Sequence, residues 1–114
     1  HTRTHPRLPE VSPERVQEEL CGSLADLKME LGPGPRTFAY PHGRFDEAVQ
    51  TAVERAGFAA ACCSRGGQND PFIPRTALRR VEIKGTDSFA DFILMTWLGR
   101  RITPRQFLRG LIFG

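Results

Sequence analysis

Two histidines, His1 and His5, stand four residues apart in the opening segment HTRTHP. Neutral imidazole is the commonest protein ligand for zinc and similar ions, and two imidazoles in one tight loop can reach the same ion. A zinc site needs at least three protein ligands, so this pair supplies only part of one. The spacing fits half of a metal site, but it also fits histidines that lie on the surface or cap a helix.

A second polar segment, FAYPHG, holds His42 between Pro41 and Gly43. Proline and glycine bend the chain sharply, and such a bend can aim backbone N–H groups at an anion. Turn chemistry alone favours the simpler alternative, an ordinary turn with an exposed histidine. Arg75, in the segment FIPRTALRR, could pair with a carboxylate near a site, although a solvated arginine is again the simpler expectation.

The composition is that of one ordinary globular domain. The chain has 114 residues, of which 39% are hydrophobic and 25% charged, so it can bury one modest core. The net charge of +3 comes without a recognisable nucleic-acid-binding module, which argues against a nucleic-acid partner. No apolar run approaches the ~20 residues of a membrane span. Only the end, LGRRITPRQFLRGLIFG, is basic without acids; we expect a solvated face there, with an anionic surface as the alternative partner.

The chain has three cysteines: Cys21, Cys62 and Cys63. An odd count with one adjacent pair is a poor disulfide framework and lacks the C-x-x-C spacing of zinc sites. We therefore expect buried or semi-buried free thiols, which favour a reducing compartment such as the cytoplasm.

Hydrophobic periodicity and capping residues predict helices that alternate with strands. Expected N-caps are Ser12, Asp46, Asp87 and Thr103. We expect the apolar residues of the helix at 88–99 to lie in a core or an interface. The predicted helices are 12–31, 46–57, 88–99 and 103–113, and the predicted strands are 36–40, 58–63 and 77–83.

This alternation indicates an α/β fold of parallel βα units. In such folds, functional groups gather on the loops at the carboxyl ends of the strands. The segments HTRTHP, YPHGRF and SRGGQND each come just before a helix or after a strand, so we expect these three loops to meet at one face.

The order of the segments HTRTHP, FAYPHG and AGF resembles the C-terminal part of NodB-like polysaccharide deacetylases, carbohydrate esterase family 4. The resemblance runs from His1 to about Phe92. It implies a distorted parallel (β/α) barrel, with residues 1–99 as the C-terminal part of the catalytic domain and residues 100–114 as a basic helix or tail. It implies hydrolytic removal of N-acetyl groups from a sugar or polysaccharide.

The resemblance also implies roles for individual residues. His1 and His5 would be two ligands of a divalent metal, most commonly Zn2+. Tyr40 and Pro41 would shape the substrate groove, and the backbone N–H of His42 would donate to the oxyanion. Arg75 would replace the charge of an arginine that the family commonly has where this chain has Ala39.

Two expected features are missing from the chain. The family's Asp-Asp motif, which supplies the catalytic base and the third ligand, would lie upstream, so the chain resembles an incomplete piece. No histidine follows His42 to act as general acid. A non-catalytic carbohydrate-binding or regulatory relic of the fold is therefore the alternative, and a module that binds anionic surfaces is a third. A partial barrel would expose sheet edges and favour self-association. The substrate class would suit the cell envelope.

Overall fold

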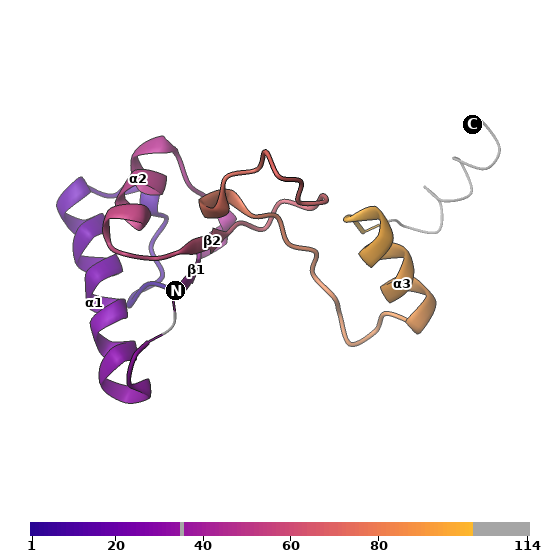
Figure 1. The fold of residues 1–114 in the computed structure, drawn as a ribbon, viewed down its shortest axis with the longest axis horizontal. Coiled ribbons are helices and arrows are strands. Elements are labelled where there is room, and N and C mark those ends of the chain that lie inside the picture. The colour runs from indigo at the N-terminus through magenta and orange to yellow at the C-terminus, as the bar shows by residue number, and fades with distance from the viewer. Residues whose placement is uncertain (35, 102–114) are drawn as a thin grey trace.

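The computed structural model describes residues 1–34 and 36–101, and it shows an α/β arrangement (Figure 1). Helices α1 and α2 lie beside a small sheet, and α3 lies apart from it, beyond a long irregular segment (Figure 1). The elements are, in order, the short 3-10 helix η1 (Leu8–Glu10), α1 (Pro13–Leu31), β1 (Thr37–Ala39), η2 (Pro41–Gly43), α2 (Glu47–Arg55), β2 (Ala60–Cys62), η3 (Arg75–Ala77) and α3 (Phe89–Leu98).

The first two long helices begin where the sequence predicts. The hydroxyl of Ser12 accepts a hydrogen bond from the Arg15 N–H, and the Asp46 carboxylate accepts one from the Val49 N–H. These caps satisfy backbone donors that a helix leaves free at its N-terminus. The caps of α1 and α2 are therefore confirmed.

Strands β1 and β2 pair in parallel, with Phe38 opposite Ala61. Helix α2 lies between them in the chain, as in a βα unit. The predicted parallel arrangement is confirmed for this pair. The sheet described here has two strands, so the barrel stays a prediction.

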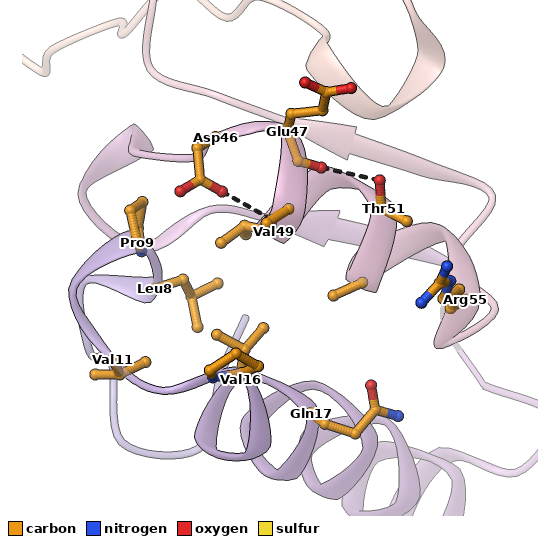
Figure 2. Close-up of a pocket in the computed structure, with 13 residues that line it drawn as sticks. Leu8, Pro9, Val11, Val16, Gln17, Asp46, Glu47, Val49, Thr51 and Arg55 are labelled. Carbon is orange, nitrogen blue, oxygen red and sulfur yellow. Dashed lines mark hydrogen bonds between the residues drawn. The ribbon is translucent and has the colours of Figure 1, made fainter.

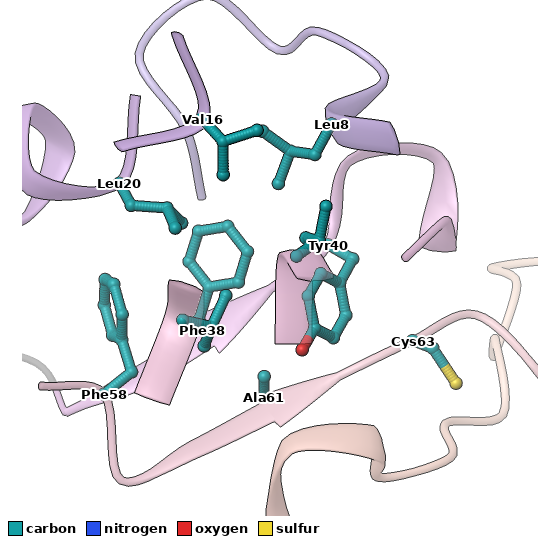
Figure 3. Close-up of a cluster of buried hydrophobic side chains, with 10 residues drawn as sticks. Leu8, Val16, Leu20, Phe38, Tyr40, Phe58, Ala61 and Cys63 are labelled. Atoms are coloured by element: carbon teal, nitrogen blue, oxygen red, sulfur yellow. The ribbon is translucent and has the colours of Figure 1, made fainter. Parts of the chain in front are cut away.

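The core lies between the two strands and α1 and α2 (Figure 3). The ring of Phe38 contacts those of Tyr40 and Phe58, with centroids 5.5 and 5.1 Å apart. Val16 and Leu20 bring α1 to this cluster, whereas Leu31 at the end of the same predicted stripe is exposed. The face of α1 is thus buried from Val16 to Ser23, partly buried at Leu24, and exposed at its end.

The predicted strand at 77–83 is wrong. Leu78 forms one isolated parallel bridge with Cys62, and the chain beyond it is irregular. Leu78 does pair with β2, since its N–H donates to the Ala61 carbonyl and its carbonyl accepts from the Cys63 N–H. The backbone groups of the next residue, Arg79, face the opposite edge, where the Asn69 side chain accepts from the N–H and donates to the carbonyl. A side chain rather than a further strand therefore satisfies that edge.

Helix α3 begins one residue later than predicted. Ser88 is its N-cap and forms a capping box with Asp91, while Asp87 pairs with Arg101. Of its apolar side chains, Met95 is buried, whereas Phe89, Phe92 and Trp97 are exposed. The core alternative is therefore wrong for these three aromatic residues, and the interface alternative stays a prediction. The predicted helix at 103–113 lies outside the described residues.

The three cysteines are free thiols. Cys63 is buried and Cys62 half-buried, as predicted, whereas the prediction is wrong for Cys21, which is exposed on α1. Within residues 1–34 and 36–101, no helix is both long and apolar enough to cross a membrane.

Candidate functional site

Three imidazoles meet at the carboxyl end of β1. The ring centroids of His1 and His5 lie 4.6 Å apart, and those of His5 and His42 also lie 4.6 Å apart. A Cβ built on Gly43 would fall 1.8 Å from the Ser64 hydroxyl oxygen, so the loop after β2 lies directly against the PHG turn. The structure therefore brings all three predicted loops together.

The orientation of His1 is set by the strand. Its Nδ1 lies 2.6 Å from the carbonyl oxygen of Ala39, the last residue of β1. A carbonyl oxygen only accepts hydrogen bonds, so Nδ1 must carry the proton. In the neutral ring, Nε2 then holds a free lone pair. This arrangement, with one nitrogen held by a carbonyl and the other available, is typical of metal-ligating histidines.

The backbone at His5 is strained. Its φ angle is +59°, a left-handed conformation that residues other than glycine adopt rarely. The Thr2 hydroxyl accepts a hydrogen bond from the His5 N–H at 3.0 Å and holds the loop in this shape. Strain of this kind is concentrated at functional sites, where the surrounding structure enforces it.

His42 has the same unusual backbone, with φ +56°. The Gly43 N–H bonds to the Tyr40 carbonyl and the Arg44 N–H to the Pro41 carbonyl, so two turns overlap here. Among the described residues, no group accepts a hydrogen bond from the His42 N–H. This donor is therefore available to an anion, as its predicted role requires.

Tyr40 lies in the core rather than in a groove. Its side chain is 1% exposed, stacks on Phe45 at 4.5 Å, and donates from its hydroxyl to the Thr76 carbonyl at 2.7 Å. Burial also raises the pKa of this phenol well above its ordinary value, so it stays protonated. The geometry favours a role in fixing the loop over the predicted contact with substrate.

Pro41 is buried behind the turn, and Arg75 is exposed at the start of η3. Within the described part of the chain, Arg75 has no ion-pair partner. Its contact with a substrate stays a prediction.

In the described ranges, no group of three or more His, Cys, Asp or Glu side chains could hold a metal ion. His1 and His5 fit a metal as two of its ligands, because their rings are adjacent and the Nε2 of His1 is free. A third ligand would have to come from elsewhere in the protein.

Two supports of the site were missed by sequence analysis. One is the Ala39 carbonyl, which no side-chain pattern reveals. The other is Glu19, whose carboxylate accepts from both the N–H and the hydroxyl of Thr4. The sequence does contain an indication of Glu19, because a charged residue between Val16 and Leu20 interrupts the apolar face of the predicted helix.

A pocket of about 820 Å3 lies elsewhere, between η1, α1 and α2 (Figure 2). Its walls are largely aliphatic, including Leu8, Val16 and Val49, and none of the three histidines lines it. The candidate site is therefore the histidine cluster rather than this pocket.

Comparisons with known proteins identify the family of the chain. The family model described as polysaccharide deacetylase matches residues 1–61, which include all three histidines. No curated protein matches the chain significantly.

Solved structures share the fold. A polysaccharide deacetylase from Bacillus cereus is 29% identical with a TM-score of 0.74, and the match covers 82% of this chain and 30% of that one. One from Bacillus anthracis, described as putative, is 26% identical with the same TM-score and the same two shares. The deacetylase PplD of Streptococcus pyogenes, solved with acetate, is 23% identical with a TM-score of 0.77, covering 82% of this chain and 42% of that one.

The chain thus spans less than half the length of these structures. The matched segment contains both histidine loops and the strand between them. The family match covers more than half of the 114 residues, and the chain therefore belongs to the polysaccharide deacetylase family.

Proposed function

We propose that the protein containing this chain removes N-acetyl groups from a sugar or polysaccharide by metal-dependent hydrolysis. The observation that carries the proposal is the adjacency of His1 and His5, with the Nε2 of His1 free, beside the unpaired N–H of His42. Membership of the polysaccharide deacetylase family supports the substrate class.

In this proposal, His1 and His5 hold a divalent metal, most commonly Zn2+, and an upstream carboxylate is the third ligand. The metal would polarise the acetyl carbonyl and lower the pKa of the attacking water. The water adds to the carbonyl carbon, the C–N bond breaks, acetate leaves and the sugar nitrogen takes up a proton. The base and the acid for these transfers would lie outside this chain.

The His42 N–H has a separate task. As the carbonyl carbon becomes tetrahedral, its oxygen gains negative charge, and a fixed N–H donor stabilises that charge. Loss of one such donor costs about 3 kcal/mol, or roughly a hundredfold in rate. The double turn at Pro41–Gly43 holds the donor in place without rearrangement during the reaction.

The test is acetate release from N-acetylglucosamine oligomers by the chain extended with its upstream sequence. We expect activity that a chelator removes, that Zn2+ restores, and that His5→Ala abolishes. Acetate release that survives both the chelator and His5→Ala would contradict the proposal.

The second candidate is a non-catalytic, carbohydrate-binding relic of the fold. It is favoured by the lack of a third metal ligand among the described residues, and by the absence of any histidine after His42. This candidate predicts that the extended chain binds the oligomers but releases no acetate under any metal condition.

A further inference from the structure

Glu19 is a charged residue in a buried position. It lies on α1, is 1% exposed, and sits among the residues that join this helix to the core. A buried carboxylate is unfavourable unless hydrogen bonds and an opposite charge compensate it. An apolar side chain would be the ordinary choice here, so the contacts that Glu19 makes need a reason.

Those contacts converge on the histidine loop. One carboxylate oxygen of Glu19 accepts from the Thr4 N–H at 2.9 Å, and the other accepts from the Thr4 hydroxyl at 2.5 Å. Arg15, one turn earlier on α1, pairs with the second oxygen at 2.7 Å. A two-pronged bond of this kind fixes both the position and the rotation of Thr4.

Thr4 directly precedes His5, whose backbone is left-handed. On the other side of Thr4, the His5 N–H donates a hydrogen bond to the Thr2 hydroxyl, which closes the turn from Thr2 to His5. Together these contacts restrain the backbone on which His5 stands beside His1. A strained loop needs such restraint, because otherwise it relaxes to commoner φ angles.

We infer that Glu19 is a positioning residue for the metal site: through Thr4 it holds His5 in its ligating position before any metal binds. The inference rests on the proposed function, because it gives His5 the role of a ligand. Glu19 touches neither metal nor substrate, so its effect should appear in metal affinity.

The same loop offers a matched control. Arg3 pairs with Asp26 on α1 through two bonds of 2.6 Å, but both side chains are about half exposed. Exposed ion pairs contribute little, since water competes for them and side-chain entropy is lost. Asp26→Asn therefore breaks a link between the loop and α1 without opening a buried site.

The experiment measures Zn2+ affinity by titration calorimetry, on the chain extended upstream, with folding checked by circular dichroism. Glu19→Gln keeps the shape but removes the charge that pairs with Arg15, and either orientation of the amide turns its N–H2 group toward a group that only donates, the Thr4 N–H or the Arg15 guanidinium. We expect it to weaken binding about tenfold, the lower end of the effect of outer-shell partners. Asp26→Asn should stay within about twofold. Val16→Ala, which weakens the packing of α1 but not the loop contact, should also stay within about twofold.

Thr4→Val removes the hydroxyl and provides an independent test, which also serves if Glu19→Gln fails to fold. We expect Thr4→Val to weaken zinc binding several-fold, and the double variant to be no weaker than Glu19→Gln alone, because both changes break one contact. Unchanged affinity in folded Glu19→Gln or in Thr4→Val, or an equal loss in Val16→Ala, would overturn the inference. His5→Ala separates the two proposals: if it leaves zinc binding unchanged, the proposed function fails as well.

Discussion

The Nδ1 of His1 lies 2.6 Å from the carbonyl oxygen of Ala39, although the two residues are 38 positions apart in the chain. This contact ties the first candidate ligand to the end of β1, next to the turn that carries His42. One end of a short strand thus orients the ring that we propose as a metal ligand and positions the backbone donor that we propose for the oxyanion.

Substitutions of His42 distinguish the contribution of its backbone N–H to activity from that of its imidazole. His42→Ala keeps the N–H, so we expect deacetylase activity within about fivefold of the parent, far from the roughly hundredfold loss of a missing donor. His42→Gly is the control for the φ of +56°, which glycine adopts without strain. Activity in the extended chain is the measurement. A hundredfold loss in both variants would assign the chemistry to the imidazole instead.

Gly43 is required by contact as well as by conformation. A Cβ there would lie 2.7 Å from the backbone nitrogen of Ser64, in addition to the clash with its side chain. We expect Gly43→Ala to lower the free energy of unfolding by about 2–4 kcal/mol, the sum of left-handed strain and overpacking. Urea unfolding measures this.

Gly57→Ala is the matched control for Gly43. Its φ is also positive, at +94°, but nothing lies within 4 Å of the added Cβ. It should cost only about 1–2 kcal/mol, from backbone strain alone. Equal losses at Gly43 and Gly57 would show that the contact with Ser64 is unimportant.

Tyr40→Phe tests whether this tyrosine supports the loop. The change leaves the Thr76 carbonyl without the hydroxyl that bonds to it in the core, at a cost of about 1–2 kcal/mol. We expect lower stability in urea unfolding and an unchanged KM for the sugar oligomer. A raised KM with unchanged stability would restore the predicted contact with substrate.

Glu19 predicts a specific pH dependence of stability. Burial works to raise the pKa of its carboxyl, but the hydrogen bonds from Thr4 and the charge of Arg15 outweigh this and hold the pKa below its ordinary value. A lowered pKa means that the ionised form stabilises the fold above about pH 4.5, and that this contribution is lost as the pH falls through the folded-state value. Glu19→Gln should therefore lose less stability than the parent between pH 7 and pH 3 in urea unfolding. Parallel losses in both proteins would contradict this.

The sequence predicts the first half of the fold well because local signals agree there. Ser12 and Asp46 cap their helices, and the apolar periods of both helices match the buried faces near these caps. The strand at 77–83 is reduced to one bridge at Leu78, and the next residue, Arg79, bonds to the Asn69 side chain, which comes from a loop whose path depends on tertiary structure.

The candidate site likewise has some features that the sequence predicts and others that it does not. Motif spacing suffices to bring His1, His5 and His42 together, since βα topology places their loops at one edge. Spacing does not show that Tyr40 points into the core, because tyrosine suits a groove and a buried position equally. The support from Ala39 comes through a backbone carbonyl, which side-chain patterns do not encode.

The most direct test of the account is zinc titration calorimetry on the 114-residue chain, on the chain extended upstream, and on His5→Ala versions of both. Two histidines without a carboxylate form an incomplete site, so we predict weak binding by the chain alone and tight binding by the extended form. His5→Ala should abolish the tight binding. If the extended form binds no zinc, or binds it equally well without His5, the metal-dependent deacetylase account is wrong.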